Sequence, residues 1–242
     1  MKKKKLIISI MLIAIIILVG SLFALQNSNE EKTNNEDAIK FKEEYESLNG
    51  EVNEKNDKEY RELSISKDNP FIYKEADDIV EMINNEATFA VYFGFNSCPW
   101  CRSVIPTLIE VAKDTEIEKI YYVDVKEIRD TIEINDNGEL ETTKEGTDGY
   151  YKLIELLGDV LSDYTLTDSD GNKISANEKR IYAPNVVIVV DGKAEKMESG
   201  ISDKQIDGYM ELTDEIKEDT YNKFENILEY MYVKQHTCDD AC

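Results

Sequence analysis

The feature that most constrains the fold is a long apolar strand pattern followed at once by a helix pattern. Residues 88–95 (TFAVYFGF) are almost wholly apolar and β-favouring, which predicts a central strand covered on both faces. After a break at Asn96–Ser97, residues 99–113 carry apolar side chains at helical spacing, and residues 120–125 form a second apolar strand pattern. Strand, helix and strand in this order predict a parallel pair with a right-handed crossover, so the chain is expected to be an α/β protein.

Further patterns are expected to complete one domain over residues 59–218. The apolar run 185–190 (NVVIVV) predicts a third buried strand, and Asp191–Gly192 predicts a tight turn after it. Residues 126–180 are less regular and are interpreted as an insertion before that strand. The other expected elements are strands over 60–66 and 193–198, helices over 76–85, 150–161 and most of 202–232, and hairpin turns at 136–138 and 170–171.

The N-terminus carries a pattern typical of membrane insertion. Four lysines, Lys2–Lys5, precede an uncharged apolar run over residues 6–25, which as a helix would be roughly 30 Å long. By the positive-inside rule the lysines stay in the cytoplasm and the rest of the chain is exported, so residues 1–25 are predicted to form a single-pass transmembrane anchor. A cleaved signal peptide, which would leave the protein secreted, is the alternative, although the nearest cleavage site, Val19–Gly20–Ser21, fits poorly. Residues 26–58 are then interpreted as a polar linker with one short amphipathic helix marked by apolar residues at 38, 41, 45 and 48.

The charge balance and the residue inventory exclude several classes of function. The formal net charge of −23 repels nucleic-acid phosphates, which argues against DNA or RNA binding. Only one histidine, His236, is present, so neither a Ser-His-Asp hydrolase nor a His-rich metal centre is expected. Four cysteines are too few for a disulfide-stapled scaffold in 242 residues, so their positions carry the information.

Two of the cysteines stand at the junction between the first buried strand and its helix. Cys98 falls at the helix N-cap, where unpaired N–H groups and the helix dipole stabilise a thiolate. Pro99 suits the first helical position, Trp100 follows it, and Cys101 lies one turn on, within reach of a disulfide with Cys98. The pattern predicts redox chemistry in which an exposed Cys98 attacks a substrate disulfide and a buried Cys101 resolves the mixed disulfide.

Two other interpretations of this Cys-x-x-Cys pair stay open. A zinc site would need His236, Cys238 and Cys242 to fold back onto it. The second interpretation is a purely structural disulfide between Cys98 and Cys101, although a disulfide that closes so short a loop adds little stability and is easily reduced. Cys238 and Cys242 are themselves close enough to predict a second disulfide, either a small bridge in the tail or a redox pair that relays electrons to or from Cys98 and Cys101.

Residues 89–106 (FAVYFGFNSCPWCRSVIP) resemble the strand, Cys-x-x-Cys motif and first long helix of the thioredoxin-like superfamily, with Pro106 at the proline inside that helix. Downstream, Ala183–Pro184 followed by NVVIVVDGK is similar to the family's cis-proline strand and hairpin. The resemblance implies a thioredoxin-like α/β fold with the N-terminal transmembrane helix in front of it, the insertion over 126–180 before the cis-proline strand, and a C-terminal helix and cysteine-containing tail over 219–242.

Individual residues also have expected roles, of which those of Pro184, Ala183 and Tyr92 follow from the resemblance. Pro184 is expected in the cis form against the two cysteines, and the backbone of Ala183 is expected to pair with an extended substrate. Trp100 is interpreted either as an apolar contact for substrate or as packing against the insertion, which itself either shapes substrate binding or only covers the domain. Tyr92 stands where the family carries a buried acidic residue, a departure that argues against fast reductase catalysis of the thioredoxin kind. Arg102 is interpreted as a solvated helix position, with electrostatic support of a thiolate as the alternative.

Together these features predict a membrane-anchored, extracytoplasmic thiol–disulfide oxidoreductase. Its expected partners are protein thiols or disulfides outside the cytoplasm and a membrane electron-exchange partner of unknown identity; no cofactor and no metal is expected. Within the superfamily the chain is also similar to the bacteriocin-transport accessory group of bacterial proteins. The alternative function is a non-catalytic thioredoxin-fold module that tethers a partner at the membrane surface. The sequence does not decide between oxidation, reduction and isomerisation.

Overall fold

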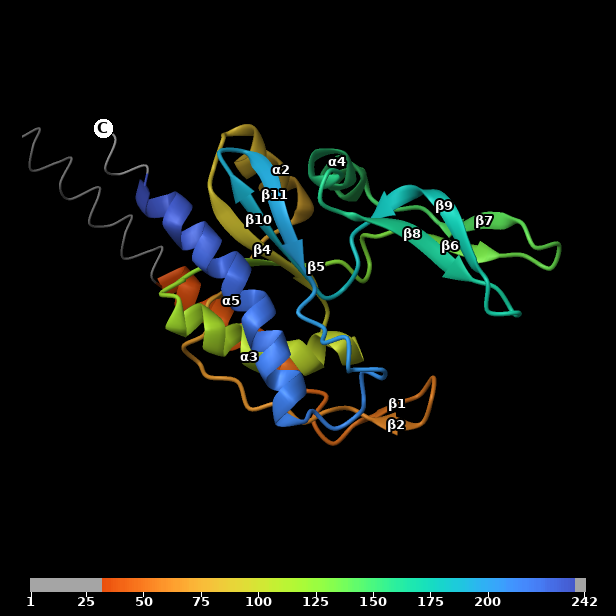
Figure 1. The fold of residues 1–242 in the computed structure, drawn as a ribbon, viewed down its shortest axis with the longest axis horizontal. Coiled ribbons are helices and arrows are strands. Elements are labelled where there is room, and N and C mark those ends of the chain that lie inside the picture. The colour runs from red at the N-terminus through yellow and green to blue at the C-terminus, as the bar shows by residue number, and fades with distance from the viewer. Residues whose placement is uncertain (1–31, 238–242) are drawn as a thin grey trace, which may run out of the picture.

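A mixed five-stranded sheet forms the centre of the computed structural model, which describes residues 32–237 (Figure 1). Its strand order is β11-β10-β4-β5-β3, with β3 and β4 parallel to β5, and with β10 antiparallel to both β4 and β11. The expected parallel pair and the α/β class are therefore confirmed. The strands of this sheet are β3 (Phe71–Tyr73), β4 (Phe89–Gly94), β5 (Ile120–Asp124), β10 (Asn185–Val190) and β11 (Lys193–Glu198).

Every residue of β4 and β10 is buried because helices cover both faces of the sheet. Along β4, Ala90 and Tyr92 point into one cluster of core side chains, and Phe89, Val91 and Phe93 point into the other. The first cluster lies against α3 (Pro99–Asp114), α5 (Asp214–Thr237) and the helix over 32–46, and the second lies against α2 (Ala76–Asn84) and α4 (Asp148–Leu157). The run over 88–95 is almost wholly apolar because one helix layer covers each face of β4, as the sequence predicted.

The helix predicted inside the linker over residues 26–58 is present, and it belongs to the core. It runs over 32–46, and both Phe41 and Tyr45 are completely buried. Phe41 stacks on Phe71 of β3 with ring centroids 4.0 Å apart. These residues are therefore not a linker, because their aromatic side chains complete the layer that also contains α3 and α5.

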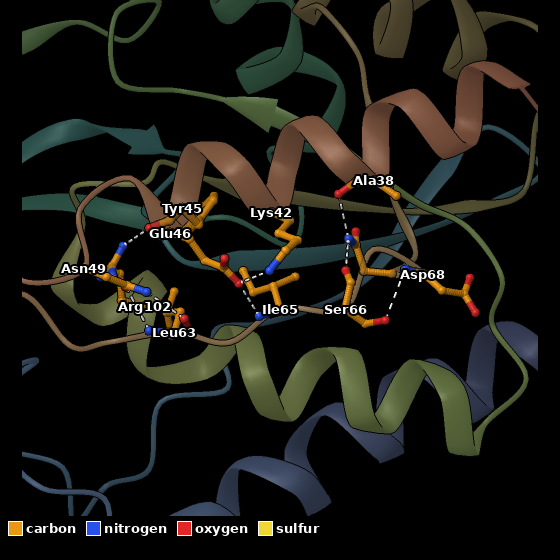
Figure 2. Close-up of polar contacts among 11 residues, drawn as sticks. Ala38, Lys42, Tyr45, Glu46, Asn49, Leu63, Ile65, Ser66, Asp68 and Arg102 are labelled. Atoms are coloured by element: carbon orange, nitrogen blue, oxygen red, sulfur yellow. Dashed lines mark hydrogen bonds and ion pairs between the residues drawn. The ribbon is translucent and has the colours of Figure 1, made fainter.

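The strand predicted over residues 60–66 is wrong. This segment is extended but has no neighbouring strand, because side chains satisfy its backbone (Figure 2). The Leu63 N–H donates to Asn49 Oδ1 at 2.9 Å, and the Ile65 N–H donates to Glu46 Oε1 at 2.7 Å. A short hairpin of β1 (Val52–Asn53) and β2 (Lys58–Glu59) precedes it. The sheet edge next to β5 is formed instead by β3, which is too short to show a periodicity.

The predicted insertion over residues 126–180 has two parts of different kind. Its helix, α4, buries Tyr150, Leu153 and Leu157 against the sheet and so belongs to the core. The two predicted hairpins are confirmed, and they extend together away from the sheet beyond α4 (Figure 1). They are β6 (Thr131–Ile134) with β7 (Leu140–Lys144), and β8 (Ser162–Thr167) with β9 (Lys173–Arg180).

A buried ion pair joins these hairpins to each other. Arg180 Nη1 lies 2.9 Å from Asp130 Oδ1, with only 7% and 8% of the two side chains exposed. The guanidinium also lies 3.9 Å from the ring centroid of Tyr164 in β8, and the Tyr164 hydroxyl accepts a hydrogen bond from the Ile132 N–H of β6. One ion pair and one tyrosine therefore hold both hairpins in a fixed relation.

The C-terminal helix α5 begins at Asp214, later than the pattern over 202–232 predicted, and residues 199–213 are irregular with two short turns. It crosses the expected boundary at residue 218 without a break, and Phe224 and Leu228 are completely buried in the core. Between residues 32 and 237, no helix combines the length and apolar character that crossing a membrane requires. The predicted anchor at 6–25 and the pair Cys238 and Cys242 lie outside the described residues.

Candidate active site

The first turn of α3 brings the two central cysteines together at the carboxyl end of β4. Cys98 is the N-cap residue with an extended backbone (φ −82°, ψ 115°), and its sulfur accepts a hydrogen bond from the Cys101 N–H at 3.2 Å. The sulfur therefore takes the place that a serine or aspartate oxygen usually fills at a helix start. Pro99 is the first helical residue, as predicted, where its missing N–H is not needed. Both cysteines are free thiols in this structure.

The segment before β10 closes over Cys98. The Ala183–Pro184 peptide bond is cis, which confirms the expectation for Pro184. The Cys98 thiol donates to the carbonyl oxygen of Ala183 at 3.4 Å. The register of the sheet explains this contact, because β10 pairs Asn185 with Phe93 and so delivers the residues before it to the end of β4.

Cys98 is less accessible than predicted. Its exposed fraction is 4%, and Cys101 is completely buried. The expectation of an exposed attacking sulfur is therefore wrong for this structure, since the Ala183 carbonyl lies directly against it. A substrate must displace or replace this carbonyl contact to reach the sulfur.

The surroundings of the two thiols shift their pKa values in opposite directions. Burial raises the pKa of Cys98, but hydrogen bonds from the Cys101 side chain and from the backbone N–H groups of Cys101 and Trp100, together with the positive charge of Arg129, outweigh burial and lower it below the usual value. Burial and the neighbouring Cys98 raise the pKa of Cys101 well above the usual value. Cys98 is thus the thiol prepared to ionise, and Cys101 is the thiol that keeps its proton and donates it as a hydrogen bond.

Arg129 is a functional candidate that the sequence did not single out. It lies at the start of the segment after β5, half-buried, with its guanidinium 5.1 Å from the ring centroid of Phe95. Parallel strands end at the same edge of a sheet, and β5 pairs Asp124 with Gly94 of β4. A basic residue shortly after β5 could therefore have been expected near Cys98, but only once the pairing of the two strands was known.

Trp100 lines an open groove of about 450 Å³ beside the cysteines. Pro184 and Ile201 contribute to the groove from the core of the domain, and Ser162 and Tyr182 contribute from the two ends of the β8–β9 hairpin. Trp100 is half-buried and also packs against core side chains. The position in the groove is compatible with the predicted substrate contact, whereas the packing of Trp100 is against the core of the domain and not against the insertion over 126–180. The base of the β8–β9 hairpin lines the same groove.

Arg102 does not have the solvated position that the sequence suggested. Its side chain is completely buried, and its guanidinium donates to the Tyr45 carbonyl oxygen (2.6 Å) and to Asn49 Oδ1 (2.9 Å) (Figure 2). Its Nε also donates to the Arg61 carbonyl oxygen at 3.0 Å. Oxygen atoms of two separate segments converge on it, so it ties the helix over 32–46 and the extended segment after β2 to the start of α3. Its role is to hold the site in place.

The interpretations that involve a metal or the C-terminal cysteines are not tested by this arrangement. Within residues 32–237, no three His, Cys, Asp or Glu side chains lie close enough to hold a metal ion together. His236 is exposed, its Nδ1 lies 2.8 Å from the Tyr232 carbonyl oxygen, and its ring stacks on Tyr232. Cys238 and Cys242 fall beyond the described part of the chain.

No protein-family model matches this chain, and a search of curated proteins found no similar sequence. The function is therefore argued from the geometry of the site.

Proposed function

We propose that the chain is a thioredoxin-like thiol–disulfide oxidoreductase that acts through Cys98 and Cys101, and that it works outside the cytoplasm from a membrane anchor formed by residues 6–25. The observation that carries the proposal is the position of Cys98. Its sulfur accepts a hydrogen bond from the Cys101 N–H at the start of α3, and it also contacts the carbonyl oxygen of Ala183, next to the cis-proline. A purely structural thiol needs neither of these contacts. The N–H of Cys101 stabilises a nucleophilic thiolate at Cys98, and a bound substrate strand can pair with the backbone at Ala183.

The reaction follows from the two pKa shifts. The Cys98 thiolate attacks one sulfur of a substrate disulfide, a Cys98–substrate disulfide forms, and the other substrate sulfur leaves as a thiolate that takes up a proton. Cys101 then loses its proton and attacks the Cys98 sulfur, which forms the Cys98–Cys101 disulfide and releases the second substrate thiol. The substrate gains two electrons and two protons, and the two cysteines lose them; the same steps in reverse oxidise a dithiol.

The test is to trap the intermediate with a Cys101→Ala variant of the full chain. Its reduced form should accumulate a mixed disulfide with oxidised glutathione or insulin, detected by mass spectrometry on the peptide that contains Cys98. The matched control is Cys98→Ala, which should form no such adduct and should not accelerate the reduction of insulin by dithiothreitol. A wild-type chain that forms no mixed disulfide and shows no turnover would refute the proposal and favour the non-catalytic tethering module.

A further inference from the structure

Three tyrosine hydroxyls in the core beside Cys101 make no hydrogen bond of ordinary geometry. They belong to Tyr45, Tyr92 and Tyr122, and each side chain is completely buried. Their rings form one group, with Tyr92 stacked on Tyr122 at 5.8 Å and Tyr45 at 6.2 Å from Tyr122. A buried hydroxyl without a partner costs on the order of 1–3 kcal/mol relative to a satisfied one, so a cluster of three calls for a reason.

The Tyr92 hydroxyl is the one that reaches the end of β4, where Cys101 lies. It sits against Gly94, two residues further along the same strand, and a Cβ at position 94 would come within 2.5 Å of Tyr92 Oη. Glycine at 94 therefore keeps this space open for the hydroxyl. The backbone N–H of the next residue, Phe95, acts on the Cys101 thiol, which places the sulfur at the same end of the strand.

Tyr92 and Cys101 each shift the pKa of the other, although the Tyr92 hydroxyl makes no hydrogen bond of ordinary geometry in the dithiol form. Burial and Cys101 raise the pKa of Tyr92 well above its usual value, so the hydroxyl keeps its proton. Burial and Cys98 raise the pKa of Cys101, whereas Tyr92 and the Phe95 N–H act in the opposite direction. A neutral hydroxyl favours a neighbouring thiolate only by donating to it.

A hydroxyl that donates to the Cys101 thiolate would act in the resolving step. Cys101 must become a thiolate in a completely buried position before it can attack the Cys98 sulfur. From the geometry of this cluster we infer that the Tyr92 hydroxyl donates a hydrogen bond to the Cys101 thiolate during the resolving step, an inference that rests on the proposed oxidoreductase function. Tyr92 keeps its own proton throughout. The proton lost by Cys101 ends on the departing substrate thiolate, the Cys98–Cys101 bond forms, and the Cys98–substrate bond breaks.

The titratable groups around Cys101 come from several elements. They are Cys98 at the start of α3, Tyr45 on the helix over 32–46, Tyr92 on β4 and Tyr122 on β5. Arg102 follows Cys101 in α3, but its guanidinium is bonded to Tyr45 and Arg61 backbone oxygens. Among these tyrosines, Tyr92 is the one whose hydroxyl favours the Cys101 thiolate. Tyr122, from the same cluster, therefore serves as its matched control.

The experiment compares Tyr92→Phe with Tyr122→Phe in the full chain. Each variant keeps its ring and removes one buried hydroxyl: that of Tyr92 acts on Cys101, whereas that of Tyr122 acts on Tyr45. The reduced proteins are mixed with oxidised glutathione, quenched with acid at intervals, and analysed by mass spectrometry for the mixed disulfide and for the final Cys98–Cys101 disulfide, over a range of pH. For Tyr92→Phe we expect an unchanged rate of attack and a resolving step about tenfold slower at neutral pH, the size expected for one hydrogen bond to a charged sulfur. The difference from wild type should close at high pH, where Cys101 ionises without help.

The control and the second variant make the result decisive. Tyr122→Phe should resolve at the wild-type rate, and Gly94→Ala should slow the resolving step because its Cβ displaces the Tyr92 hydroxyl. A wild-type rate in Tyr92→Phe at every pH, or equal slowing in Tyr92→Phe and Tyr122→Phe, overturns the inference while leaving the proposed function intact. A slowing that persists unchanged to high pH also overturns it, because that is the signature of a structural defect. If Cys101→Ala traps no mixed disulfide through Cys98 and the wild-type chain shows no turnover, the proposed function itself is defeated.

Discussion

The thiol of Cys98 donates to the carbonyl oxygen of Ala183 at 3.4 Å, across 85 residues of sequence. The antiparallel pairing of β10 with β4 creates this contact, because Asn185 lies opposite Phe93 and the chain reaches Cys98 just before β10 begins. Only the protonated sulfur can donate to a carbonyl. Ionisation of Cys98 therefore ends this hydrogen bond, so the state of the nucleophile and its contact with the cis-proline segment are linked.

The opposite pKa shifts predict that the two cysteines of the reduced protein react at different pH. The pKa of Cys98 is lowered from its usual value and that of Cys101 is raised well above it, so Cys98 should ionise at a lower pH than Cys101. Alkylation by iodoacetamide, followed by peptide mass spectrometry, should give a lower midpoint for Cys98 than for Cys101. Cys101→Ala should raise the Cys98 midpoint, because it removes the side-chain hydrogen bond that favours the thiolate. Reversed midpoints would contradict the assignment of nucleophile and resolving thiol.

Arg129 should tune the same thiolate through its charge. We expect Arg129→Gln to raise the pKa of Cys98 and to slow its alkylation at neutral pH by about twofold, with a smaller difference at high salt because the interaction is Coulombic. Lys126→Gln is the matched control: it removes the same charge from an exposed position three residues earlier. Equal slowing in both variants would show that net charge, not the position of Arg129, controls the rate.

Arg102 should be essential to stability. Arg102→Met leaves the carbonyl oxygens of Tyr45 and Arg61 without their buried donor, and we expect it to lower the free energy of unfolding by about 3 kcal/mol. Arg102→Lys should restore little, because an ammonium group cannot match the fork of the guanidinium. Urea unfolding, monitored by circular dichroism, measures the free energy of unfolding of both Arg102 variants. Lys113→Ala, which removes an exposed charge from the last turn of the same helix, should cost less than about 1 kcal/mol. A stability close to wild type in Arg102→Met would mean that its hydrogen bonds do not hold the N-terminal segments.

The ion pair between Arg180 and Asp130 should decide the stability of the two hairpins. Asp130→Ala leaves a buried guanidinium uncompensated, which costs about 3–5 kcal/mol. We expect loss of hydrogen-exchange protection and faster proteolysis over the two hairpins, residues 131–144 and 162–180, with α4 unaffected. Glu127→Ala serves as the comparison, because Glu127 is 80% exposed in its pair with Lys144, and a surface pair contributes at most about 1 kcal/mol. Equal protection in the two variants would argue against a role for the buried pair.

Much of the framework could be predicted from local patterns. The apolar runs of β4 and β10, the stripe of α3 and the Asn-Gly and Asp-Gly turns of the hairpins each lie in a few consecutive residues, and all of them are present. The strand prediction over 60–66 was wrong because alternating apolar and polar side chains are typical of any extended chain. Whether an extended chain joins a sheet depends on its partner, and here the partners are the side chains of Asn49 and Glu46.

The sequence by itself determined the α/β layering and the N-cap position of Cys98, because periodicity and helix-start chemistry are local properties of the chain. Only the tertiary structure decided what surrounds the two sulfurs. The Ala183 carbonyl, the Arg129 charge and the Tyr92 hydroxyl act on them from the segment before β10, from the loop after β5 and from within β4. The same holds for Arg102, which the pattern of α3 placed in solvent and which the N-terminal segments bury. Burial and charge act through space, so they are fixed by which segments pack together and not by the order of residues along any one of them.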